Sequence, residues 1–526
     1  MSMRRFKWLA SGVTGVVVIA AAALAATALA SGNRATAGGI IVDGTTDSVT
    51  NIDPAGNYDF GSATLDAAIF QHLLEYKPGQ VAKGPQPTLA TKCAFVGKSL
   101  KTYSCTLRKG VKFHNGEEMT SADVKWSFDR VVKIKDSSGI YTLLSNLKSV
   151  TTNGTYGVTF HLKTAQSTWP LILTTGAAQI VPKSVYPAGK LEPNSAKQIG
   201  TGPYTLETYT PGQQAVLKAN PNYWGPKAKN DGIIIRYYSK SSTMKLALQK
   251  GEVDMAFRDF TPTEYKSLAT QKGIKVHKGP GSSIRYLVLN VKRAPTNDIN
   301  VRRAIAYLFP RTAIASRVYN GTVQPLYSMV PKGLPGHIDA FKTYFGSSPS
   351  VAKARAALAK SGANLPVPLE LWYTPSHYGD ASADEFAEIK RGLETGGLFK
   401  VTLKSAEWAQ YSDALGGQYG AFQLGWFPDY VDGENYLLPF YQSSSNFTKN
   451  DYKSARMDSV LKKEQAAKTG TARIKLIKQA QVIAATDVSI IPYWQGAMIA
   501  VSKSNVKGID QTLDPSFIMR FWLLSK

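Results

Sequence analysis

The sequence has few cysteines and histidines. Its 526 residues include two cysteines, Cys93 and Cys105, and six histidines. The separation of twelve between the cysteines fits neither a C-x-x-C redox pair nor the paired thiolates of a zinc site. The histidines are dispersed, and no H-E-x-x-H pattern occurs. We therefore expect no metal site and no cofactor.

Acidic residues are also scarce relative to basic ones. The chain has 62 Lys and Arg against 37 Asp and Glu, for a formal net charge of +25. A nucleic-acid-binding protein usually concentrates such charge in a stripe. Here the basic residues are scattered, and nowhere do three follow one another. The charge therefore indicates a diffusely basic surface, and we expect no nucleic-acid partner.

Signatures of catalysis are absent or occur at chance level. Lys468-Thr469-Gly470 matches the K-T-G motif of penicillin-interactive enzymes, but S-x-x-K occurs five times and S-D-N not at all. No G-x-S-x-G elbow is present, and the glycines at 200–203 lack the rest of a dinucleotide-binding fingerprint. We expect that the protein is not an enzyme.

The N-terminus has the pattern of an export signal. Arg4, Arg5 and Lys7 precede an apolar run at 9–29, and Ala28-Leu29-Ala30 offers a signal peptidase site before Ser31. Residues 1–30 are therefore a signal peptide or, as the alternative, an uncleaved N-terminal anchor, because the run is long enough to span a bilayer. No cysteine follows the run, so the protein is not a lipoprotein. We expect an extracytoplasmic protein that is periplasmic, secreted or associated with the cell envelope.

In an exported protein, which lies in an oxidising compartment, the two cysteines can form a disulfide with each other. Strand-like residues flank both, at 94–96 and 102–104, and 97–101 supplies a turn. A hairpin brings paired Cβ atoms near the roughly 3.5–4.5 Å that a disulfide requires. We expect a Cys93–Cys105 disulfide; two buried free thiols are the alternative.

The most informative stretch is residues 418–441. Residues 421–426 have strand-forming character, and Pro428 ends the strand because it has no N–H to donate. Asp429, Asp432 and Glu434 follow, interleaved with aromatic residues that include Trp426 and Tyr430. A carboxylate between aromatic walls suits a cation with an apolar body, such as a peptide amino terminus. The alternative is a solvated turn whose aromatic residues belong to the core.

Several segments, in order, resemble the family 5 extracellular solute-binding proteins of ABC importers, the peptide- and nickel-binding group. They cover about residues 40–526 and are TLRKGVKFHNGEEMTSADV at 106–124, GTGPYTL at 200–206, NPNYWG at 220–225, GEVDMAF at 251–257, LNVKRAPTNDINVRRAIAYLFPRTAI at 289–314, GWFPDYVDGENY at 425–436 and SIIPYW at 489–494. The length of the chain and its alternation of strands and helices independently favour several lobes of α/β type.

The resemblance implies an α/β, periplasmic-binding-protein-like two-lobed fold with an extra domain. Lobe I would comprise 38–80, 196–290 and 495–526; lobe II would be 81–195 and lobe III 291–494. Chain crossings near 289–292 and 493–496 would form a hinge between the two ligand-gripping lobes.

The same resemblance implies a function. The protein would be the extracytoplasmic substrate-binding component of an ABC transporter, a monomer that closes on a short peptide and delivers it to a membrane permease. Asp429 would hold the α-ammonium of the ligand, with Trp426 and Tyr430 lining the pocket, while Asp432 and Glu434 would contribute less if they lie at its rim. The alternatives are an oligosaccharide or other small solute as ligand, or a non-transport role in a biosynthetic or signalling pathway. No residue is assigned to the peptide carboxylate; Arg258 and Arg391 are weak candidates.

Overall fold

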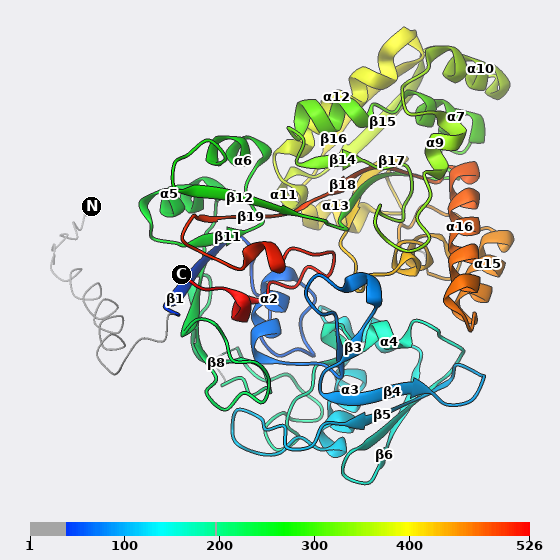
Figure 1. Cartoon of the computed structure of the whole chain (residues 1–526). Coiled ribbons are helices and arrows are strands. Elements are labelled where there is room, and N and C mark those ends of the chain that lie inside the picture. Colours follow the sequence, from blue (N-terminus) through cyan, green and yellow to red (C-terminus); the bar gives the residue numbers. More distant parts are fainter. Residues whose placement is uncertain (1–37, 195–196, 446) are drawn as a thin grey trace, which may run out of the picture.

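The computed structural model describes residues 38–194, 197–445 and 447–526 (Figure 1). The expected signal peptide or anchor at 1–30 lies outside these ranges. Within them, no helix is both long and apolar enough to cross a membrane. Sheets of seven, six and four strands are interleaved with helices, which confirms the α/β class.

The seven-stranded sheet is built from both ends of the chain. In spatial order its strands are β12 (Ile274–Gly279), β19 (Met498–Lys503), β11 (Met255–Phe257), β1 (Ile40–Thr45), β10 (Gly232–Tyr237), β9 (Gln214–Ala219) and β8 (Tyr204–Thr210). Strand β1 runs parallel to β10 and β11, and the other pairs are antiparallel. Helices α2 (Phe60–Ile69), α5 (Ser241–Lys250) and α6 (Pro262–Leu268) accompany this sheet.

The four-stranded sheet is antiparallel and lies at the bottom of Figure 1. Its order is β4 (Ala90–Phe95), β5 (Thr102–Leu107), β7 (Gly157–Leu162) and β6 (Leu147–Asn153). Helix α3 (Ser121–Ile134) packs on it and begins with a capping box, in which the Asp123 carboxylate accepts a 2.9 Å hydrogen bond from the Thr120 amide. Helix α4 (Trp169–Ile172) and the ribbon of β2 (Leu74–Glu75) and β3 (Gln86–Pro87) lie between this sheet and the rest of the molecule.

The expected disulfide is present in this sheet. Cys93 of β4 is paired directly with Cys105 of β5, their Cα atoms are 4.1 Å apart, and their sulfurs are bonded. The hairpin predicted from the flanking residues therefore brings the two cysteines together.

The six-stranded sheet contains the region around residues 418–441. Its order is β14 (Val323–Pro325), β18 (Ile490–Gly496), β13 (Ile284–Leu289), β17 (Ala421–Trp426), β15 (Val367–Tyr373) and β16 (Phe399–Ser405). Its helices are α7 (Ile299–Leu308), α8 (Arg311–Ala313), α9 (Ala340–Phe345), α10 (Val351–Ser361), α11 (Pro375–Tyr378), α12 (Ala381–Glu394), α13 (Trp408–Ala414), α14 (Leu438–Tyr441), α15 (Ala455–Gln465) and α16 (Gly470–Asp487). Every residue of β13 is buried, as befits a central strand covered on both faces.

Short helical turns complete the chain. They are η1 (Val81–Lys83), η2 (Ile140–Leu144), η3 (Gly176–Ala178), the π-helical turn η4 (Ile314–Val318), η5 (Thr395–Gly397), η6 (Gly433–Tyr436), η7 (Ile509–Gln511) and η8 (Phe521–Leu523).

The chain passes between the two large sheets twice, at 280–283 and at Ala497. These crossings touch each other: the Gln495 side-chain amide donates to the Gly281 carbonyl (2.7 Å), and the Gly496 amide donates to the Ser283 carbonyl (2.9 Å). Strand β13 pairs along its length with β17 and β18, so residues 284–289 belong to the six-stranded sheet, whereas the expected lobe I extended to 290. The division into three lobes stays a prediction.

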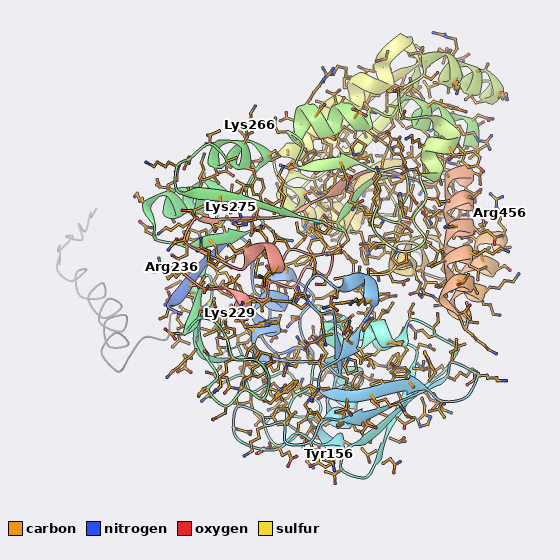
Figure 2. The ribbon with its side chains drawn as sticks, in the orientation of Figure 1. Tyr156, Lys229, Arg236, Lys266, Lys275 and Arg456 are labelled. Atoms are coloured by element: carbon orange, nitrogen blue, oxygen red, sulfur yellow. A yellow bond between two sulfur atoms is a disulfide. The ribbon has the colours of Figure 1, made fainter. Side chains whose placement is uncertain are left out.

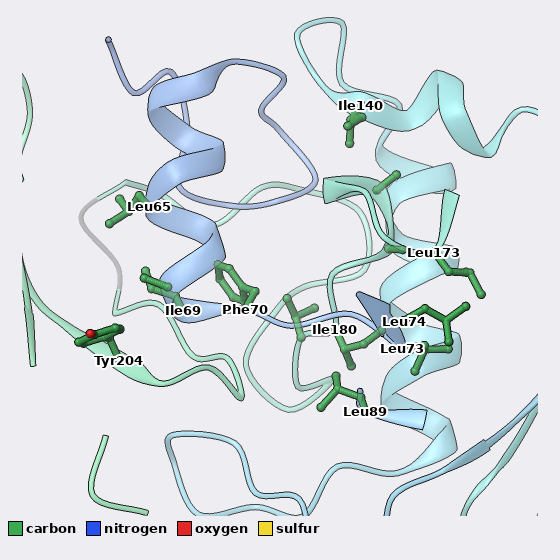
Figure 3. Close-up of a cluster of buried hydrophobic side chains, with 14 of the residues drawn as sticks. Leu65, Ile69, Phe70, Leu73, Leu74, Leu89, Ile140, Leu173, Ile180 and Tyr204 are labelled. Atoms are coloured by element: carbon green, nitrogen blue, oxygen red, sulfur yellow. The ribbon is translucent and has the colours of Figure 1, made fainter. Parts of the chain in front are cut away.

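Apolar packing joins the seven-stranded sheet to the four-stranded sheet, whereas the six-stranded sheet has cores of its own. One core extends from the seven-stranded to the four-stranded sheet; Figure 3 shows part of it, with Leu65, Ile69 and Phe70 of the α2 region near Ile180. The six-stranded sheet has a core on each face, because Leu287 and Leu289 point to one side and Tyr286 and Val288 to the other.

Basic side chains are distributed over the outside of the molecule. Figure 2 labels Lys229, Arg236, Lys266 and Lys275 on the side of the seven-stranded sheet, and Arg456 on the opposite side of the view. This distribution agrees with a diffusely basic surface.

Candidate functional site

The segment after β17 leaves the sheet where the sequence predicts. Strand β17 ends at Trp426, and Pro428 precedes Asp429, which is half-buried. The β17 end pairs with the start of β13, so it lies beside the crossing at 280–283. Asp429 is therefore held at the edge of the six-stranded sheet that faces the other sheet.

Asn435, in the turn η6, fixes the Asp429 carboxylate. Its side-chain N–H donates to Asp429 Oδ2 (2.9 Å), and its Oδ1 accepts from the Asp429 amide (2.9 Å) and from the Trp426 indole (3.0 Å). These bonds set the orientation of the carboxylate before any ligand arrives. Desolvation raises the pKa of Asp429, and hydrogen bonds from Asn435 and Tyr58 oppose that rise.

Tyr58 reaches Asp429 from the other side of the crossings. It lies in the loop between β1 and α2, and its hydroxyl donates to Asp429 Oδ1. The Tyr58 side chain is 50% exposed, so this contact borders solvent. Neither Tyr58 nor Asn435 was predicted from the sequence, although the D-x-x-x-x-x-N spacing from Asp429 to Asn435 offered a signal for the latter.

Aromatic side chains from both sides meet next to this contact. Phe427 lies 4.6 Å from Phe60 and 5.4 Å from Phe517, measured between ring centres. The Arg258 guanidinium stacks over Phe60 at 4.3 Å and over Phe427 at 5.3 Å. Phe427 is 40% exposed, so the cluster is an apolar wall beside Asp429 that is partly open to water.

Arg258 is held in place by acids of the seven-stranded side. It pairs with Asp47 (2.8 Å) and with Asp259 (3.2 Å). Desolvation raises the pKa of Asp47 to about 6, with Arg258 opposing and Asp259 adding to the rise. Arg258 and Asp259 both adopt left-handed backbone conformations, with φ of 67° and 69°, which are uncommon for residues with side chains and concentrate at functional sites.

The structure places Trp426 and Tyr430 differently from each other. Trp426 is partly buried and meets Phe440 and Phe447 edge-on at 5.2 and 5.1 Å. Tyr430 is buried, and its hydroxyl donates to Glu434 (2.6 Å). Trp426 is linked to Asp429 through Asn435, whereas the Tyr430 hydroxyl is bonded to Glu434. Contact of either residue with a ligand stays a prediction.

Asp432 and Glu434 do not lie at a rim, so the condition under which they were expected to contribute less is not met. Asp432 is 9% exposed and accepts two hydrogen bonds from Arg473 of α16, at 2.7 and 3.0 Å. Glu434 is fully buried beside them, and burial raises its pKa. The sequence could not reveal this because Arg473 comes from a separate helix.

Two cavities of the described chain lie away from Asp429. A cavity of about 680 Å³, bordered by Lys292, Arg302, Arg303, Lys453 and Arg456 among others, lies past the opposite end of β13. Among the described residues, no group of three or more His, Cys, Asp or Glu side chains is arranged to hold a metal ion. The contact region around Asp429 therefore remains the candidate site.

The chain is similar to known peptide-binding proteins over most of its length. It is 27% identical over 458 residues to the dipeptide-binding protein of Escherichia coli K12, covering 81% of this chain and 82% of that one. Among solved structures, the periplasmic binding protein DppA of Helicobacter pylori in complex with the peptide STSA superposes with a TM-score of 0.78, at 24% identity, over 93% of this chain and 98% of that one. The dipeptide binding protein of Pseudoalteromonas sp. SM9913 in complex with Met-Leu gives a TM-score of 0.76, at 20% identity, over 93% and 100% of the two chains.

These superpositions confirm the periplasmic-binding-protein fold. The model of the bacterial extracellular solute-binding proteins, family 5 (middle), matches residues 84–448. The resemblance seen in the sequence motifs and the match to the family model agree. The chain belongs to the family 5 bacterial extracellular solute-binding proteins.

Proposed function

We propose that the protein binds short peptides with a free α-amino group and that Asp429 receives the ammonium. The observation that carries this proposal is the Asp429 carboxylate itself, which Asn435 orients and which faces a contact between the two large sheets. Relatives named as dipeptide-binding proteins support a peptide as the ligand.

The chemistry of the site suits an ammonium better than a neutral group. Desolvation makes the Asp429 charge costly, and a cation that arrives with three N–H donors offsets this cost. A carboxylate has about four acceptor positions, so an ammonium can join Asn435 and Tyr58 without displacing them. The aromatic wall of Phe60, Phe427 and Phe517 would contact the apolar part of the ligand.

Closure would follow from the placement of these groups. Tyr58, Phe60 and Arg258 lie on the side of the seven-stranded sheet, while Phe427 and Asp429 lie on the side of the six-stranded sheet. A ligand that touches both sides favours the closed arrangement by its differential affinity for it. The two crossings provide the axis for that motion.

The wider role follows from the family. We propose that the closed protein acts as a monomer, catalyses no reaction and presents its peptide to a membrane ABC permease. We also propose that export removes residues 1–30. Mass spectrometry of the exported protein should find Ser31 at or near the N-terminus. An intact N-terminus on membrane-bound material would show instead that residues 1–30 stay as a membrane anchor.

Calorimetry with Met-Leu, Ser-Thr-Ser-Ala and their N-acetylated forms tests the proposed function. We expect the free peptides to bind and acetylation to weaken binding by about 10²-fold, since a desolvated charge pair is worth roughly 3 kcal/mol or more. Equal binding of free and acetylated peptides would show that Asp429 does not receive the peptide ammonium. Stabilisation by neutral oligosaccharides, without any by peptides, would overturn the peptide proposal.

A further inference from the structure

Arg285 of β13 is a buried cation with unused hydrogen-bond donors. Its side chain is 8% exposed, and within the described ranges no group accepts a hydrogen bond from its buried Nε and Nη1 atoms. The guanidinium instead lies 3.7 Å from the centre of the Tyr378 ring and 5.0 Å from that of Trp494. Aromatic faces attract a cation, but they do not replace the hydrogen bonds that it loses on burial.

Glu385 of α12 is the acid whose charge acts on Arg285, but its carboxylate oxygens accept hydrogen bonds from other donors. It accepts from the Tyr319 hydroxyl (2.7 Å), the Trp494 indole (2.8 Å), the Gln423 amide (2.8 Å) and the Tyr493 hydroxyl. Across the part of the chain that the structure describes, no carboxylate lies within ion-pair distance of Arg285. Glu385 therefore lowers the electrostatic cost of the Arg285 charge without satisfying its N–H groups.

Other buried arginines of the protein are satisfied much more fully. Arg130 pairs with Asp53, and Arg520 pairs with Asp514. Arg302 donates to four backbone carbonyl contacts, and the Nε of Arg311 donates to the carbonyls of Leu326 and Pro492, both at 2.9 Å. Arg311 also has no ion pair and leaves its buried Nη2 without an acceptor, whereas Arg285 leaves two buried donor atoms, Nε and Nη1, without one in the described chain.

Arg285 lies against Gly425 of β17 and Tyr378 of α11. Gly425 is its cross-strand partner, and a Cβ there would lie 2.8 Å from Arg285 Nη1, so only glycine permits this close approach. Tyr378 is half-buried, and its neighbour His377 is exposed and stacks on Trp408. Partial desolvation and the nearby Arg285 charge lower the pKa of His377 to about 4, so His377 is neutral at pH 7.

Arg285 and Asp429 lie at the same end of the six-stranded sheet. Gly425, which faces Arg285, precedes Asp429 by four residues, and an extended chain of four residues spans at most about 14 Å. A peptide of about two to four residues has the same reach. Arginine binds carboxylates with paired N–H donors, which a terminal carboxylate matches.

We propose that Arg285 receives the C-terminal carboxylate of the peptide whose ammonium meets Asp429. This assignment rests on the proposed function and narrows it to zwitterionic peptides of about two to four residues.

Calorimetry on the full exported chain tests the assignment with Met-Leu, which has one carboxylate, and with Met-Leu amide. The native protein should prefer the acid by about 10- to 100-fold, the range for hydrogen bonds to a charged group. Arg285→Met should lose that preference through weaker binding of the acid, with the affinity for the amide unchanged. The matched control is Arg311→Met, which removes another buried arginine stacked on aromatic rings and should keep the preference.

The outcomes separate the two proposals. If neither Met-Leu nor Ser-Thr-Ser-Ala binds the native protein, the proposed function fails and the assignment fails with it. If Met-Leu binds but its amide binds equally well, the assignment fails while the proposed function stands. Equal weakening of acid and amide in Arg285→Met would make Arg285 a structural residue only. Should that variant not fold, Arg285→Lys gives the same test, because a point charge should retain only part of the preference for the acid.

Discussion

Asp429 differs from Asp432 and Glu434, the two acids that follow it within six residues. The difference is whether the protein itself places a cation beside the carboxylate. Asp429 is bound by Asn435 and Tyr58, which are both neutral. Asp432 and Glu434 lie in a buried group with Glu464 and the guanidinium of Arg473, whose Nε donates to Glu464 (2.7 Å). The comparison separates an acid that can take a ligand cation from acids whose cation belongs to the fold.

The largest effect should follow from removing the cation of the buried group. Arg473→Met leaves Asp432 without its ion-pair partner and Glu464 without a hydrogen-bond donor, and loss of one partner from a buried pair costs about 3–5 kcal/mol. Urea unfolding measures this loss. The control is Arg456→Met, whose exposed pair with Asp487 should contribute at most about 1 kcal/mol. Equal losses in the two variants would contradict a structural role for the group.

The next effect should appear in binding and not in folding. Asp429→Asn should weaken binding of Met-Leu by about 10²-fold, roughly 3 kcal/mol, because the ammonium loses its counter-charge. The same substitution should leave the urea midpoint nearly unchanged, since no cation of the described chain pairs with Asp429. N-acetylation should add little further loss in Asp429→Asn. A variant that binds free Met-Leu as tightly as the native protein would sink the anchor assignment.

A pH dependence should distinguish the buried group from the anchor. Burial, with the nearby charge of Glu434, raises the pKa of Glu464 from 4.5 to about 8. Between these values the folded protein keeps a proton that the unfolded chain has released, so stability falls as pH rises through this window. The slope from this group is at most about 1.4 kcal/mol per pH unit.

Urea midpoints at pH 5, 7 and 9 measure this dependence. Glu464→Gln should flatten the profile, whereas Glu207→Gln, at an exposed position on β8, should leave it as in the native protein. A Glu464→Gln profile that follows the native one would assign the pH dependence to other groups.

The smallest effect should come from Tyr58→Phe. The substitution keeps the ring but removes the hydroxyl that crosses to Asp429, a bond worth about 1 kcal/mol. Affinity for Met-Leu should fall about fivefold. Tighter binding instead would show that Tyr58 competes with the ligand for the carboxylate.

Local patterns in the sequence predicted local structure well. The strand at 421–426 and its end before Pro428 are where the alternation of residue types and the missing N–H of proline indicate. The disulfide follows from a hairpin of twelve residues' separation, and the capping box of α3 from Thr120 and Asp123. In each case, the interacting groups are neighbours in the chain.

Contacts between distant segments were beyond such reasoning. Tyr58 and Asp429 are 371 residues apart, and Asp432 meets an arginine 41 residues later on another helix. The burial of Asp432 and Glu434 therefore could not be read from an acidic turn that has the composition of a solvated one. Residues 284–289 pair within the six-stranded sheet, which the sequence could not indicate because an all-buried strand gives no alternation that identifies its sheet.

The touching crossings have a consequence for the time that a ligand stays bound. Gly281 and Gly496 leave no room for a side chain: a Cβ on the first would lie 2.4 Å from the Gly496 carbonyl oxygen, and one on the second would lie 2.5 Å from the Ser283 hydroxyl. If the proposed closure turns about these crossings, we expect two segments held this closely to move together, so that the gap opens as one movement. Residence time is then set by the frequency of that single opening, and a methyl group wedged at position 281 would shorten it without touching the ligand.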